Sequence, residues 1–129
     1  MKFKQLIYLY APPVLLMILI YYLSLQSSFP VVNDQNLSYW TDFVLKKIAH
    51  MFVYGLLMFF WFRALNDKLS VKEALILALV IVVIYAVSDE LHQTFVPERE
   101  GTIRDVLIDS VSALIVGWSI FSKQKNASI

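Results

Sequence analysis

The chain contains no cysteine among its 129 residues, so disulfide bonds and thiol chemistry are excluded. It also lacks the GxSxG, HExxH, GxGxxG and Walker patterns, which are typical of common enzyme and nucleotide-binding sites. The net charge is +1, and neither a basic arm nor an acidic tail is present. The sequence therefore shows none of these familiar catalytic signatures, and we expect no nucleic-acid partner.

Charge is missing from long stretches of the sequence. No charged residue occurs in Gln5 to Asn33, Ala74 to Ser88, or Ser110 to Ser122, and Ile48 to Phe62 contains only His50. Hydrophobic residues make up 59% of the chain, and the mean hydropathy is +0.65. A helix needs about 20 mostly apolar residues to cross a bilayer. The sequence therefore predicts an all-α, multi-pass membrane protein.

Turn and capping signals divide the chain into four predicted transmembrane helices. Their expected ranges are 4–25, 41 or 42 to 65, 71–93 and 103–121. Ser70 and Glu73 have the spacing of a capping box, as do Thr102 and Asp105. Pro12-Pro13 is expected to kink the first helix. We treat residues 1–129 as one transmembrane domain.

The N-terminus resembles the start of a signal peptide, but the apolar run that follows is too long for one, so we expect a retained first span. With both termini in the cytoplasm, seven of the 11 Lys and Arg residues lie inside. The other four are Lys46, Lys47, Arg99 and Arg104. This orientation brings the start of helix two, the end of helix three and the start of helix four together at the outer face.

Polar residues crowd these three helix ends. The stretch "SDELHQTFVPEREGTIRDVLID" spans residues 88–109 and faces a second group at the start of helix two. Residues three or four apart share a helix face. Such pairs are Lys47 with His50, Asp89 with Gln93, and Asp105 with Asp109. An ionisable group as deep as Asp109 usually faces a protein interior or a wet cavity, so the spacing predicts a polar pocket.

The same residues resemble the VanZ-like family of small bacterial membrane proteins. "KIAHMFVYGLL" is similar to a K-x-x-H helix start, and residues 88–109 to S-D-E-x-x-Q-x-F-x-P-x-R followed by D-x-x-x-N/D. The resemblance covers residues 43–117, with Asp109 where asparagine is common and Ser112 where glycine is frequent. It implies a bacterial plasma-membrane protein of the cell envelope, linked to low-level resistance to the lipoglycopeptide teicoplanin.

Three functions remain open for these residues. One is an enzyme acting on an anionic lipid or lipid-linked glycan at the outer leaflet. The others are a non-catalytic lipid-headgroup binder or transporter component, and a structural protein whose charges are interhelical ion pairs. The sequence names no protein partner. The candidate catalytic residues are His50, Asp89 and Glu90, and the candidate binding residues are Lys47, Gln93, Arg99, Asp105 and Asp109.

Each role has a chemical reason. Lys47 and Arg99 would hold a phosphate, and His50 would transfer a proton because imidazole titrates near neutral pH. Asp105 has the capping of helix four as an alternative role. Of Asp89 and Glu90, we expect one to pair with Lys47 or Arg104 and the other to lie near His50, and we favour Glu90 as the functional one.

Metal-ligating side chains are also present in this region. They are His50, His92, Asp89 and Glu90. Their spacing matches no familiar ligand pattern. The sequence therefore predicts neither a metal ion nor a cofactor.

Overall fold

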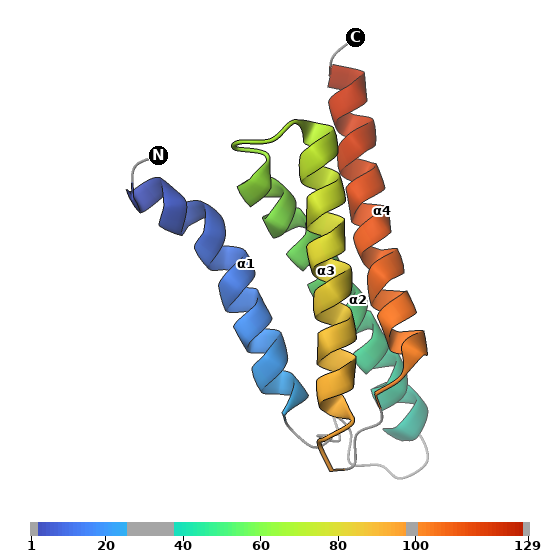
Figure 1. The fold of residues 1–129 in the computed structure, drawn as a ribbon. Helices are drawn as coiled ribbons and strands as arrows, with labels where there is room; N and C mark the ends of the chain where they lie inside the picture. The colour runs from blue at the N-terminus through green and yellow to red at the C-terminus, as the bar shows by residue number, and fades with distance from the viewer. Residues whose placement is uncertain (1–2, 26–37, 98–100, 128–129) are drawn as a thin grey trace.

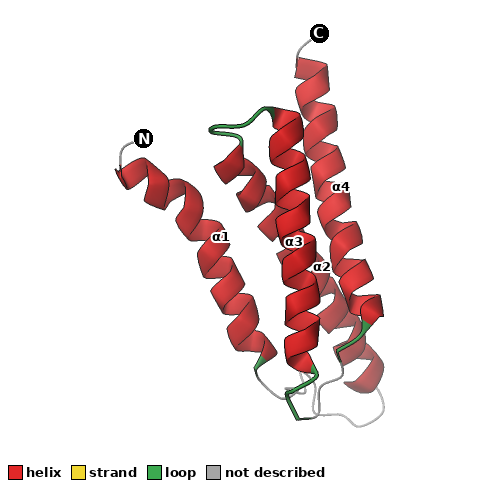
Figure 2. Ribbon diagram, viewed as in Figure 1, coloured by secondary structure: helices red, strands yellow, loops and turns green. Residues whose placement is uncertain are grey.

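A computed structural model describes residues 3–25, 38–97 and 101–127, apart from the side chains of residues 38–40, 42, 43 and 127. These residues form four helices: α1 (Phe3–Ser24), α2 (Ser38–Leu65), α3 (Val71–Gln93) and α4 (Ile103–Ala127) (Figure 1). Figure 2 shows helices joined by loops, with no strand in the described ranges. The helices alternate in direction, so α1 begins and α4 ends at the same end of the bundle (Figure 1). The predicted all-α architecture is confirmed.

Each helix contains a segment that is long and apolar enough to cross a membrane. These segments are Phe3–Ser24, Val44–Leu65, Val71–Gln93 and Ile103–Asn126. At a rise of about 1.5 Å per residue, even a segment of 22 residues exceeds the ~30 Å hydrocarbon core. The predicted four spans are therefore confirmed, and the side of the membrane that holds the termini stays a prediction. α4 continues past the predicted end at Phe121, because a helix need not stop where its apolar stretch stops.

The start of α3 follows local sequence rules. The backbone N–H of Glu73 donates to Ser70 Oγ at 3.4 Å, and the backbone N–H of Ser70 donates to Glu73 Oε2 at 3.0 Å. These two bonds form the predicted capping box and satisfy two amide donors that the helix itself leaves free. The turn before α3 thus needs no distant partner.

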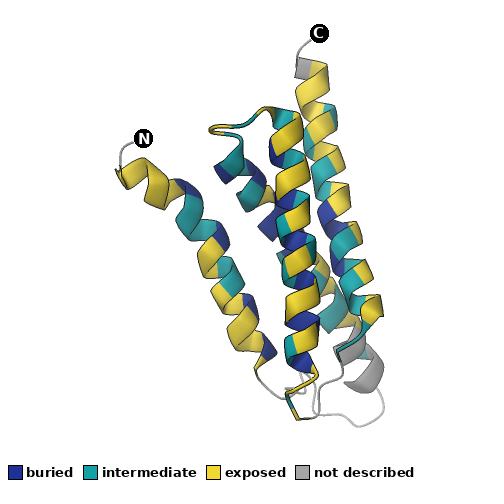
Figure 3. Cartoon of the chain, in the orientation of Figure 1, coloured by how far each residue is buried: buried dark blue, intermediate teal, exposed yellow. Residues whose placement is uncertain are grey.

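A stripe of small residues brings α3 close to the other helices. Ala74, Ala78, Val82 and Ala86 recur every four residues and are fully buried. Small side chains let helix backbones approach in a membrane, where packing rather than water exclusion holds helices together. Larger α2 side chains fill the remaining space between helices, and these are Tyr54, Leu57, Met58 and Phe62. Buried residues lie between the helices, and exposed, largely apolar ones face outwards (Figure 3).

Helix α1 lies at the edge of the bundle, in contact with α2 and α3 (Figure 1). It continues through Pro12 and Pro13, and its ribbon changes direction in its first half, as the predicted kink requires. Pro12 has no N–H to donate to the carbonyl of Tyr8. Arg63 of α2 donates to that carbonyl instead, at 2.6 Å, and its guanidinium lies 4.5 Å from the centre of the Tyr8 ring. A distant side chain therefore replaces the missing helix bond.

Candidate functional site

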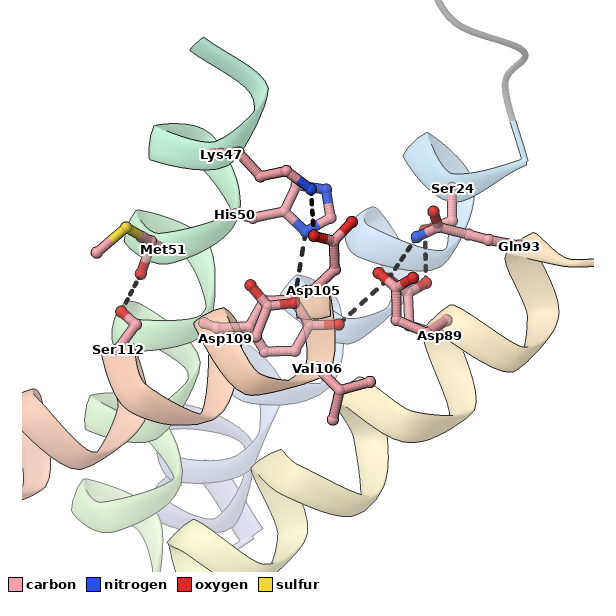
Figure 4. Close-up of polar contacts among 12 residues, drawn as sticks. Ser24, Lys47, His50, Met51, Asp89, Gln93, Asp105, Val106, Asp109 and Ser112 are labelled. Atoms are coloured by element: carbon pink, nitrogen blue, oxygen red, sulfur yellow. Dashed lines mark hydrogen bonds and ion pairs between the residues drawn. The ribbon is translucent and has the colours of Figure 1, made fainter. Parts of the chain in front are cut away.

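Buried polar side chains gather at the end of the bundle where α1 and α3 finish. In the described ranges they are Ser24, Asp89, Glu90, Gln93, Asp109 and Ser112. Helix α2 faces this group with Lys47 and His50 (Figure 4). The stripe of small residues on α3 leads directly into the group, because Glu90 follows Ala86 by four positions. Close helix packing and the polar group therefore belong to one continuous α3 face.

Asp89 accepts hydrogen bonds from three neutral donors on three helices. Its Oδ1 accepts from Ser24 Oγ of α1, and its Oδ2 accepts from Tyr54 Oη of α2 at 3.2 Å and Gln93 Nε2 of α3 at 3.0 Å. Gln93 also lies 3.4 Å from Ser24 Oγ, which closes the network (Figure 4). Both carboxylate oxygens are thus occupied, and Asp89 joins α1 to the rest of the bundle.

Glu90 caps the start of α4 from the neighbouring helix. Its Oε2 accepts the backbone N–H of Thr102 at 2.8 Å. Thr102 Oγ1 in turn accepts the backbone N–H of Asp105 at 3.2 Å. The predicted capping box of α4 is therefore half correct, because Glu90 takes the place expected for the Asp105 carboxylate. The other oxygen of Glu90, Oε1, is buried and has no hydrogen-bond partner.

The carboxylate of Asp105 is used in an ion pair instead. Lys47 of α2 donates to Asp105 Oδ1, and Arg104 Nε lies 3.9 Å from the same oxygen. We expected Lys47 or Arg104 to pair with Asp89 or Glu90, and this expectation is wrong for Asp89, whose partners are neutral. Because Glu90 accepts the Thr102 N–H at the start of α4, the Asp105 carboxylate can instead pair with Lys47 and hold α2 against α4.

His50 faces Asp109 across the α2–α4 contact. His50 Nδ1 lies 3.5 Å from Asp109 Oδ2, longer than an ordinary hydrogen bond between nitrogen and oxygen. Asp109 is 1% exposed, and its Oδ1 has no hydrogen-bond partner. One ligand atom from each of His50, Glu90 and Asp109 lies within 4.8 Å of the others. Three of the predicted site residues, from three helices, thus converge on one point.

A groove of about 180 Å³ lies beside His50, between α1 and α2. Its lining residues are Ile20, Leu23, Ser24, Lys46, Ala49, His50, Val53 and Tyr54. Lys46 and Val53 are seven residues apart, so the groove extends about 10 Å along α2. It therefore combines an ammonium, an imidazole and two hydroxyls with aliphatic walls.

Three polar groove residues were absent from the predicted site: Ser24, Lys46 and Tyr54. A signal was available for Tyr54, which follows His50 by four residues and stacks on it with 6.2 Å between ring centres. Lys46 adjoins the predicted Lys47, but we expected it to extend towards the headgroups. Ser24 carried no local signal, because its partner Asp89 is 65 positions away.

Other residues that the sequence proposed lie elsewhere or are used differently. Arg99 lies outside the described residues. His92 packs on Tyr21, with 4.6 Å between ring centres. The hydroxyl of Ser88 donates to the Tyr85 carbonyl at 2.8 Å, and that of Ser112 to the Met51 carbonyl. Among the side chains that the structure describes, no serine hydroxyl is bonded to His50 in the manner of a nucleophile.

Comparison with known proteins agrees with the sequence resemblance. A family model described as VanZ/LLP1 matches residues 11–123. No curated protein and no solved structure matches the chain. The family match includes α2 and α3, most of α1 and α4, the Asp89 network and the His50–Glu90–Asp109 group. Because it covers most of the 129 residues, the chain belongs to the VanZ/LLP1 family.

Proposed function

We propose that this membrane protein binds the polar head of an anionic envelope lipid or lipid-linked glycan at the outer leaflet. The observation that carries the proposal is the groove between α1 and α2, whose wall joins polar groups to aliphatic side chains. An amphiphilic ligand would place its anionic head near Lys46 and His50, and the first part of its chain along Ile20, Leu23 and Val53. Concave sites of this composition are typical of small-ligand binding.

The cation that faces this groove is Lys46 rather than Lys47. Lys47 forms an ion pair with Asp105, so its charge is opposed by a neighbouring carboxylate. Lys46 is half-buried at the groove and can extend its ammonium to a phosphate at headgroup level. The phosphate-binding role that we predicted for Lys47 therefore passes to Lys46. The corresponding role of Arg99 stays a prediction.

The serine contacts favour a binding role over a reaction in which a serine acts as the nucleophile. The hydroxyls of Ser24, Ser88 and Ser112 donate to a carboxylate or to backbone carbonyls, and none is bonded to His50. A second candidate function is hydrolysis of the bound head by water. It is favoured by the carboxylate of Asp109, which lies 3.5 Å from His50 Nδ1 and would orient the imidazole as a general base if this contact tightened on ligand binding.

Family membership fits a membrane protein linked to teicoplanin resistance. An outer-leaflet lipid site would act on the envelope itself, without chemical change to the antibiotic. Growth under teicoplanin therefore gives a cellular readout for the groove. A variant that closes the groove at unchanged protein level should lose any protection that the wild-type protein provides.

The direct test is lipid binding by purified protein in detergent. Phosphatidylglycerol and a polyprenyl phosphate would be titrated, with phosphatidylcholine as the neutral comparison. Lys46→Gln should weaken binding of both anionic lipids about two- to fivefold, as expected for one charge pair that is partly open to solvent. Lys72→Gln is the matched control, because Lys72 is exposed in the first turn of α3 at the opposite end.

A second variant tests the groove without changing charge. Ala49→Leu adds bulk to the groove wall and should weaken binding of all three lipids. Equal affinities for Lys46→Gln, Lys72→Gln and wild type, together with full binding by Ala49→Leu, would rule out the groove as the lipid site. Release of inorganic phosphate from the bound polyprenyl phosphate would favour the hydrolytic candidate.

A further inference from the structure

The group of His50, Glu90 and Asp109 is an unusual arrangement for a membrane interior. It contains two carboxylates that are 4% and 1% exposed, and an imidazole from a third helix. Charged groups at membrane depth are costly unless they are paired or bind an ion. The ion pair of Lys47 with Asp105 and the three neutral donors to Asp89 satisfy carboxylates outside this group.

Two oxygens in the group lack hydrogen-bond partners. They are Glu90 Oε1 and Asp109 Oδ1, both buried. Buried carboxylate oxygens normally accept hydrogen bonds or bind metal ions. Glu90 is already held in place, because its other oxygen accepts the Thr102 N–H. One oxygen of Glu90 therefore fixes the position of the side chain, and the second oxygen is left for a ligand.

The distances fit a metal ion. Around a tetrahedral ion with ligand distances of about 2.1 Å, neighbouring ligand atoms lie ~3.4 Å apart. The separation of His50 Nδ1 from Asp109 Oδ2 is 3.5 Å, too long for a good hydrogen bond but close to that spacing. The ligand atoms of all three residues lie within 4.8 Å of one another, so a small movement of the side chains would complete the set.

We propose that His50, Glu90 and Asp109 bind one divalent first-row transition-metal ion. One imidazole and two carboxylates are borderline-to-hard ligands, which suit Mn²⁺, Fe²⁺, Co²⁺ or Zn²⁺ rather than an ion that prefers thiolates. Three protein ligands leave at least one coordination position for water or a ligand. The ion would also join α2, α3 and α4 at the level of the groove, which His50 lines. The proposal replaces the sequence prediction of no metal, and it stands whether or not the groove binds lipid.

Direct metal binding tests the proposal without any assumption about function. Protein purified with a tag that contains no histidine would be stripped with a chelator and titrated with Co²⁺, followed by its visible absorption. We expect saturable binding of one ion per chain, and displacement by Zn²⁺. Absence of saturable binding would overturn the site.

The two histidines provide a matched pair of variants. His50→Gln and Asp109→Asn should each weaken Co²⁺ binding by more than about tenfold, since loss of even an outer-shell partner costs 10–100-fold. His92→Gln should bind like wild type, because His92 packs on Tyr21 outside the group. Unchanged affinity in His50→Gln, or an equal loss in His92→Gln, would overturn the assignment.

X-ray absorption spectroscopy of the wild-type protein tests the ligand set without any variant, so it remains informative if a variant fails to fold. X-ray absorption of the Zn²⁺-loaded protein should show oxygen and nitrogen ligands with one imidazole. The chain contains two histidines and no cysteine, so the number of imidazole ligands can only be none, one or two, and no thiolate can bind the ion. A shell with two imidazoles, or with none, would contradict the proposed ligand set.

Discussion

The two ends of the bundle satisfy their polar groups in different ways. At the end with the α2–α3 turn, Ser70 and Glu73 cap a helix from three residues away, and the side chains are exposed. At the other end, Asp89 is buried and binds donors from three helices, including Ser24, 65 positions away. The α3 cap is local in sequence, and the distant contacts at its end, from Arg63 to the Tyr8 carbonyl and from Gln5 to Asp67, each join two segments. The Asp89 network joins three helices and depends on the complete fold.

The second difference lies in which buried polar atoms have no hydrogen-bond partner. Among the described residues towards the α2–α3 turn these are Trp61 Nε1, Arg63 Nε and Asn66 Oδ1, and none is a carboxylate oxygen. At the site end, two carboxylate oxygens, Glu90 Oε1 and Asp109 Oδ1, are buried without partners, together with His92 Nδ1. Natural proteins keep such costly groups mainly where function requires them. The comparison thus separates three kinds of charge in one small protein: caps that end helices, a network that holds helices together, and a group poised for a ligand.

The largest loss of stability is expected for Asp89→Ala. The change removes the acceptor for Ser24, Tyr54 and Gln93 together and leaves buried donors without partners. Each buried donor left without a partner costs about 1–3 kcal/mol, so the melting temperature in detergent should fall strongly. Asp67→Ala is the control: Asp67 is exposed and accepts one bond from Gln5 at 3.1 Å, so its loss should cost less than ~0.5 kcal/mol. Similar melting temperatures for both variants would remove the distinction between the two ends.

Gly101→Ala should have the next largest effect. A Cβ at this position would lie 2.1 Å from the Glu90 carbonyl oxygen and 2.8 Å from Thr94 Cγ2. The backbone at Gly101 must then move away from α3, at a cost of about 1–3 kcal/mol. Gly117→Ala is the matched control, because its Cβ would meet the flexible end of Met58 at 3.1 Å. A larger loss in Gly117→Ala would show that Gly101 is not fixed against α3.

The helices could be predicted because their signals are local. A run of apolar residues sets each span, and Ser70 with Glu73 marks the start of α3 from adjacent sequence alone. The end of α4 was missed because charged and polar residues after Phe121 continue the helix beyond its apolar stretch. The number of spans thus follows from composition. The end of a helix beyond its apolar stretch depends instead on the helix preferences of individual polar residues.

The site could be predicted only in part. Spacing on one helix places Lys47 and His50 together, but it does not set how α2, α3 and α4 rotate against one another. That rotation decides that Asp105 pairs with Lys47 while Glu90 caps α4. It depends on close packing, such as the contact at Gly55, where a Cβ would lie 3.1 Å from Ser112 Oγ. Such contacts join residues far apart in sequence.

A moderate effect is expected for Ser70→Ala at the opposite end. The variant loses the hydroxyl that accepts the Glu73 N–H at 3.4 Å, and helix caps are worth about 1 kcal/mol. The melting temperature should fall slightly, and Co²⁺ binding should be unchanged because the cap lies far from His50. Ser119→Ala, which removes only a bond to the Ile115 carbonyl, should be closer to neutral. Weaker Co²⁺ binding in Ser70→Ala would mean that the two ends are coupled.

The smallest change in stability is expected for Glu90→Gln. In the wild-type protein, Glu90 Oε2 accepts the Thr102 N–H at 2.8 Å, and the amide oxygen of glutamine can accept the same bond. The change also removes a carboxylate beside Asp109. The free energy of unfolding should therefore change by less than about 1 kcal/mol. Asp89→Asn is the adjacent comparison: it keeps one acceptor oxygen where the network needs two, so it should melt at a lower temperature than Glu90→Gln. Binding of Co²⁺ should show the opposite order, weak in Glu90→Gln and retained in folded Asp89→Asn. Equal melting temperatures with equal Co²⁺ affinities would make both carboxylates parts of one structural network.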